Sequence, residues 1–273
     1  MNERALNRQN SSGYSLLELL IAMTLGAFVT AGLLTTLMNV YQTNLSSGKS
    51  TTTNDNLMLA MNLLTQTIQA GGYIPDPATG SASNEMPASP SNTPYSTTGQ
   101  FISGTSGSSG SNGSSDTLSV RYVTGLINGQ AGQQDSQLNC LGRGIPITAT
   151  NPTAYYIFDQ TIGADSNGNL TCTYTGESFN PTSQTTTVNE ATQTYTLLGA
   201  SNSSMLKSLN FLYGVDTNAD GSADGYYTAA QVPNWGNVIS VQATLVFNNP
   251  NAALAGQPAT YTISKIIPLM SRP

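Results

Sequence analysis

The stretch GYSLLELLIAMTLGAFVTAGLLTTLMNV, residues 13–40, decides the fold. It follows a polar segment, residues 1–13, and it carries no charge over the 22 residues from Leu19 to Val40. A helix over that run would be about 33 Å long at about 1.5 Å per residue, which is enough to cross the hydrocarbon core of a bilayer. One acidic residue, Glu18, stands at the start of the apolar run.

Several kinds of membrane segment can have this apolar character. A secretory signal peptide has an apolar core of about 7–15 residues that ends at a small-residue cleavage site, whereas this run is longer and no polar break follows it. A lipoprotein signal would place a cysteine just after the run, and none is there. A plain membrane anchor stays open, but it leaves Glu18 unexplained, because an acid in a membrane segment costs free energy and calls for a partner.

The segment GYSLLE, residues 13–18, resembles the cleavage and methylation motif of type IV prepilins. The resemblance implies that the leader, residues 1–13, is cut off after Gly13 by a membrane peptidase. It further implies that Tyr14 becomes the N-methylated first residue, in place of the usual phenylalanine. Glu18 then matches the fifth residue of the mature chain, a glutamate that serves assembly in that family.

The chemistry of residues 1–18 is consistent with this motif. Cleavage after Gly13 leaves an α-amine on Tyr14 that is cationic at or near neutral pH. This amine lies four residues from Glu18, the spacing of neighbours on one helix face. In a filament the partner could instead belong to an adjacent subunit, and one buried charge pair would then set axial register. Arg4 and Arg8 place the leader in the cytoplasm and the rest of the chain outside it.

Composition excludes several function classes. Of the 273 residues only 8% are charged, the net charge is −6, the sequence pI is near 4.3, and histidine is absent. No catalytic triad and no metal site that is built on imidazole can therefore form. Direct nucleic-acid binding is not expected, because phosphate neutralisation needs clustered Lys and Arg. A membrane-tethered enzyme is disfavoured, since no acid pair stands at a recognisable spacing, and we expect no catalytic residue and no required cofactor.

The helix is expected to continue beyond the membrane. Leu57, Met61, Leu64 and Ile68 recur at intervals of four, three and four, which predicts one apolar stripe for docking on a head domain. We expect the N-terminal helix to span residues 14–72, with 14–41 as the transmembrane or filament-core part. Its end is predicted at Gly71-Gly72, before Pro75.

Residues 73–116 are predicted to be a polar, low-complexity connection. Within it, Ser103–Ser115 contains only Ser, Gly, Thr and Asn, a composition that cannot bury a core and favours a mobile loop. A glycosylated or contact-making loop is the alternative.

The remaining residues, 117–273, are predicted to form a head domain rich in β-strands. Period-two alternation begins beyond Asp116 and is clear in Leu118–Tyr122 and Ile239–Phe247. The other strand candidates are Tyr155–Phe158, Leu170–Tyr174, Thr194–Leu198, Leu209–Tyr213 and Ala259–Ile267. The predicted fold class is α+β, with one long N-terminal helix packed on a mainly antiparallel sheet, as in pilins.

Cys140 and Cys172 stand 32 positions apart. Outside the cytoplasm an isolated pair is most simply a disulfide, which would contribute on the order of 3–4 kcal/mol by restricting the unfolded chain. A redox site would favour C-x-x-C spacing, and two free buried thiols are the other alternative.

The segment DTNADGSAD, residues 216–224, resembles a calcium loop. Oxygen ligands would come from positions 1, 3, 5 and 9 and a backbone carbonyl from position 7, with glycine at position 6 for the sharp turn; these candidates are Asp216, Asn218, Asp220, Asp224 and Ser222. Position 12 is Tyr227, so the bidentate glutamate of an EF-hand is missing. The alternative is an Asp/Asn/Gly turn that caps its own amides. A similar segment, Asp165–Asn169, is better interpreted as a hairpin turn.

The head resembles the PilW-type minor pilins in three places: Ala70–Tyr73, Tyr213–Asp216, and Trp235 before a long strand. This resemblance implies a low-abundance subunit of a pilus-tip complex that primes assembly. The expected partners are other minor pilins, the major pilin, the prepilin peptidase and methylase, and the inner-membrane assembly platform. The chain would be a single-pass inner-membrane protein with a periplasmic head, and later part of a pilus on the cell surface. Twitching motility, adhesion and DNA uptake would then be properties of the fibre.

Two other functions fit the same features. A type II secretion pseudopilin carries an identical N-terminal motif. A pilus-tip adhesin would bind a receptor or glycan through exposed aromatic residues such as Tyr226, Tyr227 and Trp235, although core packing is the more frequent role of a tryptophan.

Overall fold

A computed structural model describes most of the chain. The described residues are 15–74, 86–88, 94–95, 97–107, 115–124, 138–143, 155–180, 183, 185–199 and 206–269. Two compact units, residues 1–48 and 49–273, divide the chain, and the first helix runs through the boundary between them.

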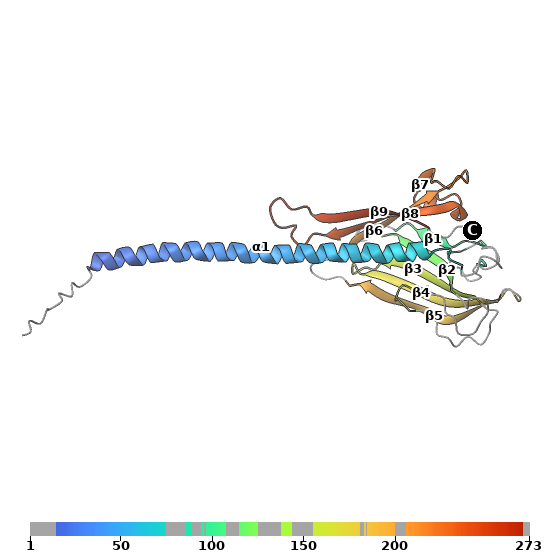
Figure 1. The fold of residues 1–273 in the computed structure, drawn as a ribbon, viewed down its shortest axis with the longest axis horizontal. Helices are drawn as coiled ribbons and strands as arrows, with labels where there is room; N and C mark the ends of the chain where they lie inside the picture. The colour runs from blue at the N-terminus through green and yellow to red at the C-terminus, as the bar shows by residue number, and fades with distance from the viewer. Residues whose placement is uncertain are drawn as a thin grey trace, which may run out of the picture. The chain divides into compact units, whose positions relative to one another are not determined.

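The helix α1 spans Leu16–Ala70 (Figure 1), close to the predicted bounds. In the first unit every side chain from Ser15 to Leu45 is exposed. In the second unit the predicted stripe is buried, together with Thr53, Ala60 and Thr67. The 55-residue helix therefore has an all-exposed apolar part and an amphipathic part whose apolar face lies in the head.

Gly71 and Gly72 end α1 where the chain turns onto the neighbouring strand. Gly72 has φ = 76°, in the left-handed region that favours glycine. Its amide donates to the carbonyl oxygen of Arg121 at 2.9 Å. A Cβ on Gly71 would lie 2.9 Å from a methyl carbon of Val120. Both glycines are thus needed for the helix end to lie this close to the sheet, and the predicted helix end is confirmed.

Five antiparallel strands form the first sheet in the order β1-β2-β3-β4-β5. Their bounds are β1 Ile102–Thr105, β2 Thr117–Thr124, β3 Tyr155–Ala164, β4 Leu170–Asn180 and β5 Thr185–Leu198. Four of them overlap the predicted strands, and β3 to β5 are longer than expected. The hairpin turn predicted at Asp165–Asn169 joins β3 to β4, and Asp165 Oδ1 accepts from the amides of Asn167 and Asn169, both at 2.9 Å.

Strand β1 lies inside the segment interpreted as a polar connection. Its sequence ISGT gives little sign of a strand, yet Ile102 and Ser103 are buried and all four residues pair with β2. A Cβ on Gly104 would clash with the ring of Tyr213. Small residues are therefore placed here because other parts of the head pack closely on this strand. The low-complexity composition concealed this function, and a mobile loop does not describe residues 103–105.

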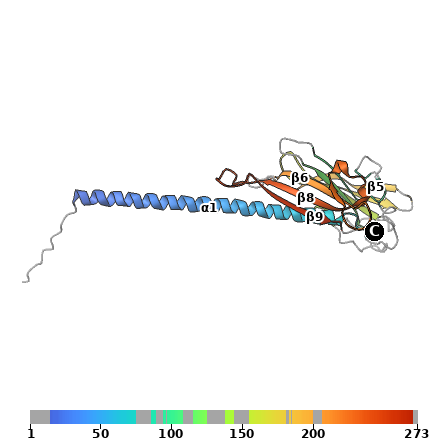
Figure 2. The same cartoon turned by 90° about the horizontal axis from the view of Figure 1, so that it is seen from above.

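Four antiparallel strands form the second sheet in the order β7-β6-β8-β9, and Figure 2 shows β6, β8 and β9 side by side. Their bounds are β6 Leu206–Val215, β7 Gly225–Tyr227, β8 Val238–Asn248 and β9 Thr260–Pro268. Between β7 and β8 lie two short 3-10 helices, η2 Ala229–Gln231 and η3 Trp235–Asn237.

One apolar cluster joins the docked part of α1 to both sheets. It includes Leu64 and Ile68 of α1, Ile162 of β3, and Leu245 of β8, all fully buried. Asp116 links the sheets through polar contacts, since its amide donates to the carbonyl of Leu209 at 2.7 Å and its Oδ2 accepts from the amide of Phe211 at 2.8 Å. The predicted α+β, pilin-like fold is confirmed.

Candidate functional site

The N-terminal motif and the start of α1 form the first candidate site. Gly13 and Tyr14 lie outside the described residues. Glu18 lies in the first turn of α1, where a carboxylate gains from the helix dipole. Ser15 Oγ accepts from the amide of Leu17 at 3.3 Å, so Ser15 caps the start of the helix. This capping by Ser15 was not predicted.

The apolar half of α1 keeps its polar groups satisfied within the helix. Five threonine hydroxyls in it donate back to carbonyls three or four residues earlier, namely those of Thr24, Thr30, Thr35, Thr36 and Thr43. Such bonds lower the cost of a hydroxyl in an apolar environment. Among the described residues, α1 is a helix long and apolar enough to cross a membrane.

The disulfide between Cys140 and Cys172 is confirmed, with 6.5 Å between the two Cα atoms. It joins the loop at residues 138–143 to β4. The same loop is held by Tyr122, whose hydroxyl donates to the carbonyl of Leu138 at 2.7 Å. Asn139 Oδ1 accepts from two loop amides at 3.0 Å each. The loop is therefore fixed on the sheet by covalent and polar bonds.

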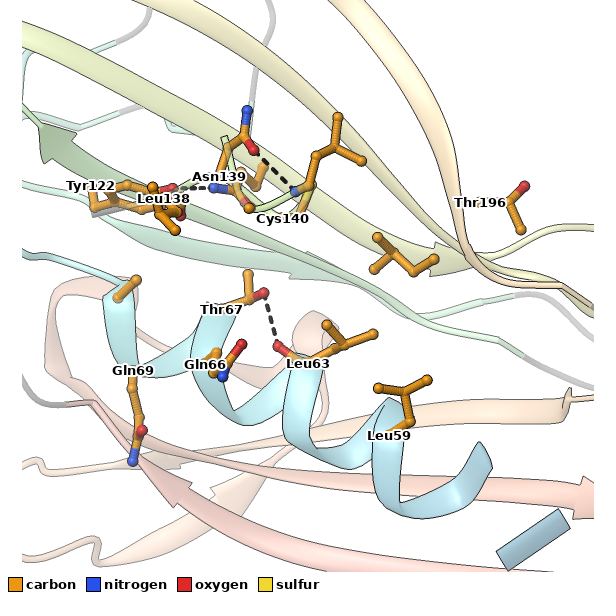
Figure 3. Close-up of a pocket in the computed structure, with 15 residues that line it drawn as sticks. Leu59, Leu63, Gln66, Thr67, Gln69, Tyr122, Leu138, Asn139, Cys140 and Thr196 are labelled. Carbon is orange, nitrogen blue, oxygen red and sulfur yellow. Dashed lines mark hydrogen bonds between the residues drawn. The ribbon is translucent and has the colours of Figure 1, made fainter. Parts of the chain in front are cut away.

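An open groove of about 800 Å³ lies between this loop and α1 (Figure 3). Leu59 and Leu63 line it from the helix, and Leu138 and Leu141 line it from the loop. Tyr122 lines it from β2, and that ring begins an aromatic row over β2 to β5 with centroid separations of 5.6, 6.4 and 5.9 Å; the other members are Phe158, Tyr174 and Tyr195. None of the 15 lining residues is charged.

A buried charge cluster lies around Arg121. The guanidinium bonds Asp159 through Nε at 2.7 Å and donates to the carbonyl of Pro87 at 2.6 Å. It also stacks 4.5 Å above the ring of Tyr95. Glu177 shares the same guanidinium at 3.8 Å, but its Oε2 has no hydrogen-bond partner among the described residues. This cluster fastens part of the connection to the sheet.

Glu177 is the unusual member of the cluster. Burial raises the pKa of its carboxyl above the ordinary value, Asp159 raises it further, and Arg121 acts in the opposite direction. Burial likewise raises the pKa of the Tyr95 hydroxyl. These residues were not predicted as a site. The available signal was Arg121, a charged residue inside a predicted strand.

The loop predicted to bind calcium joins β6 to β7. Asp216 is only 1% exposed, and its two carboxylate oxygens accept from the amides of Ala219 at 2.6 Å and Gly221 at 2.9 Å. Both partners have positive φ, 62° and 87°, so the backbone curls around the carboxylate. This geometry is that of a loop that caps its own amides.

The other predicted ligands also bond within the loop. Asp224 Oδ2 accepts from the hydroxyl of Thr217 at 2.6 Å and from its amide at 2.8 Å, and these bonds lower the pKa of Asp224. Asn218 donates to Asp220 at 3.1 Å, and the amide of Ser222 donates to Asp220 at 2.8 Å. In the part of the chain that the structure describes, no three His, Cys, Asp or Glu side chains gather into a metal-binding group. Calcium binding stays a prediction.

Comparisons with known families match both ends of this architecture. The prokaryotic N-terminal methylation motif matches residues 8–34. The family PilW, type IV pilus-assembly protein W, matches residues 154–268, which include β3 to β9. No curated protein and no solved structure shows a significant match to the chain.

A prepilin-type N-terminus that continues into a long helix and an antiparallel head defines a type IV pilin. Within that class, the match over the head identifies the chain as a PilW-type pilin. Membership supports membrane anchoring, association with a pilus, and interaction with other pilins and with a prepilin peptidase. The family is one of structural pilins and is not known for enzymatic activity.

Proposed function

We propose that the mature chain begins at Tyr14 and joins a pilus-tip complex that primes assembly of the fibre. One observation carries this proposal: the methylation motif at residues 8–34 and the PilW match at residues 154–268 occur in one chain. The first supports processing by a prepilin peptidase, and the second supports a minor pilin. Other minor pilins, the major pilin and the inner-membrane platform would be its partners.

In this proposal Glu18 neutralises a terminal amine. Every residue from Ser15 to Leu45 is exposed in the isolated chain, so this half of α1 must be covered by lipid before assembly and by other helices afterwards. A carboxylate inside such a bundle needs a cationic partner. The amine of Tyr14, of the same subunit or of a neighbour, would supply it, and the pair would fix the axial register.

The fibre provides the downstream activities in this proposal. Before assembly the head would lie in the periplasm, and afterwards the subunit would lie at the pilus tip outside the cell. Twitching motility, attachment and DNA uptake would depend on the number of fibres. The description of the PilW family favours a pilus over a secretion pseudopilus.

Fewer observations support the alternative of a tip adhesin that acts through exposed aromatic residues. Tyr226 is 39% exposed. Trp235 packs edge-to-face on the buried Tyr213 at 4.7 Å, and Tyr227 pairs with Tyr213 in the sheet register. Two of the three aromatic residues therefore belong to the packing of the second sheet.

Mass spectrometry of the mature N-terminus tests the proposal directly. We expect a chain that begins with N-methylated Tyr14, and its presence in sheared fibres. Replacing Gly13 by a bulkier residue should leave the chain about 13 residues too long, because the peptidase requires the small residue at the cut. Isolation of native chains that retain Met1 and an unmethylated Tyr14 would refute the proposal.

A further inference from the structure

The groove between α1 and the disulfide-bonded loop carries exposed leucines on both of its walls. Its helix wall carries Leu59, which is 47% exposed, and its opposite wall carries Leu138, which is 51% exposed. Large apolar side chains at this exposure leave apolar surface in water, which costs free energy until a partner covers it. The opposite wall is held rigid by the Cys140–Cys172 bond and by the Tyr122 hydroxyl, so little order has to be gained on binding.

We propose that this groove receives the apolar N-terminal helix of a neighbouring pilin subunit, which lies along α1 between Leu59 and Ala70. The proposal rests on the function proposed above, because it requires that the chain enters a fibre or a tip complex. It adds a defined contact on the head to the contacts made among N-terminal helices.

The chemistry of the groove selects this occupant. The lining mixes leucines with polar side chains that carry no charge, so it cannot form an ion pair with a charged segment, and desolvating such a segment here would be unfavourable. The N-terminal half of α1 is the matching shape: an uncharged helix, exposed on every side from Leu19 to Leu45, that has to be covered once it leaves lipid. A neighbouring subunit of this class brings such a helix.

The dimensions also fit. From Leu59 to Ala70 the helix advances by about 16 Å, or about three turns. Two helices that pack side by side have axes about 8–10 Å apart, and side chains of one fill the spaces between those of the other. Leu59, Leu63 and Gln66 lie on one face of α1 at intervals of four and three, as a helix-in-groove contact requires.

A matched pair of substitutions tests the contact. Leu59→Asp places a charge in the groove, whereas Met58→Asp places the same charge one residue away, on a side chain that is 63% exposed and does not line the groove. Asp55 lies one turn before both, so the local electrostatic cost is similar. Full-length variants are expressed in cells, and each is measured in the membrane fraction and in sheared fibres.

For Leu59→Asp we expect a normal amount in the membrane and at least about a tenfold lower amount in fibres, since burying an unpaired carboxylate in an apolar contact costs more than one decade of affinity. Met58→Asp should enter fibres like the wild type. Equal incorporation of both variants would overturn the groove contact while leaving the proposed function intact. Absence of the wild-type chain from fibres would instead overturn the proposed function.

A photo-crosslinking residue at Leu63 identifies the occupant. We expect an adduct whose peptide, read by mass spectrometry, comes from the N-terminal helix of a pilin subunit. The same residue at Thr194, on an exposed part of β5, serves as the control and should not capture that peptide. A crosslink from position 63 to a head domain or to lipid would refute the assignment, and so would the absence of any crosslink.

Discussion

The two halves of α1 differ in composition, and their burial differs in the opposite direction to what their apolar content suggests. From Ser15 to Leu45 no side chain is buried, although the segment is the most apolar part of the chain. From Thr53 to Ile68 a narrow stripe is buried in the head, although polar residues surround it. The amount of apolar surface therefore does not decide whether a helix is covered by its own chain.

The distribution of apolar residues explains the difference. Apolar residues all around a helix give one chain no way to cover every side, so the first half depends on lipid or on other subunits. A stripe at intervals of three and four directs one face to one partner, and the head supplies that partner. The first half thus depends on contacts outside its own chain, whereas the second half packs on the head of the same chain.

Among the substitutions that test this difference between the two halves, Glu18→Ala should have the largest effect. We expect normal membrane insertion and head stability but at least about a tenfold loss of the chain from fibres, because the partner of the terminal amine is lost. Fractionation of cells into membrane and sheared fibres measures both quantities. Incorporation at the wild-type level would show that the carboxylate does not set register.

The next effect concerns the buried stripe. Leu64→Ala should lower the free energy of unfolding of the head by about 2–5 kcal/mol, since Leu64 is fully buried and the change leaves a cavity. Leu34→Ala, at a side chain that is 58% exposed, is the matched control and should leave head stability unchanged. Denaturation of the full chain in detergent, followed by the fluorescence of Trp235, the single tryptophan, gives both values. Equal losses of head stability in the two variants would contradict the division of α1 into an exposed half and a half that packs on the head.

Elements whose sequence pattern is local were predictable from the sequence. The stripe of α1, the alternation in β8 from Val238 to Asn248, and the end of the helix at two glycines each depend on residues close together in the chain. The pairing of Cys140 with Cys172 was predictable because only two cysteines exist and the N-terminal motif predicts a head outside the cytoplasm. These parts of the fold follow from periodicity and compartment alone.

Features that depend on distant residues were not predictable. Arg121 meets Asp159 across 38 positions, and neither residue has a neighbour in sequence that announces the pair. Strand β1 lies at the start of a segment rich in Ser and Gly, where no local pattern indicates a strand, and Gly104 leaves room there for the ring of Tyr213. The groove requires the helix, the loop and β5 to be placed first. Tertiary packing decides all three.

Removing the disulfide should destabilise the head by about 2–4 kcal/mol and should leave the apolar half of α1 unaffected. A Cys140→Ser, Cys172→Ser double variant avoids a free thiol, and its urea midpoint should fall without loss of membrane insertion. The crosslink also holds one wall of the groove, so incorporation into fibres should fall as well. An unchanged midpoint would show that the polar bonds of Asn139 and Tyr122 hold the loop alone.

Calcium binding by the loop at residues 216–224 would have a smaller effect on the stability of the head. If the loop binds the ion, calcium at about 100 times its dissociation constant should stabilise the head by about 2.7 kcal/mol. Calorimetry on the full chain should then show heat that disappears in Asp220→Ala, whereas Asp165→Ala, in the hairpin turn, should still bind. Identical titrations for the wild type and Asp220→Ala would eliminate the metal, and the loop would be a turn that caps its own amides.

The smallest effect should come from the pH dependence of the Arg121 cluster. Because the pKa of Glu177 is raised in the folded head, the folded state binds this proton more tightly than the unfolded state. Its contribution is fully present below the ordinary pKa of a glutamate and is lost as pH rises through the raised folded pKa. Glu177→Gln should therefore flatten this part of the profile and stabilise the head at neutral pH. A gain of about 1 kcal/mol would raise the melting temperature by roughly 2–4 °C.

The control for this titration is Asp55→Asn, at an exposed carboxylate on α1, which should follow the wild-type profile. Melting temperatures of the three proteins between about pH 4 and pH 8 decide the matter, since the ordinary pKa of a glutamate lies at the lower end of that interval and burial raises the pKa of Glu177 from there. If Glu177→Gln melts lower than the wild type at neutral pH, the carboxylate stabilises the head through Arg121 at 3.8 Å more than its burial costs. The contact of Glu177 with Arg121 would then help to hold the segment at Pro87 and Tyr95 on the sheet.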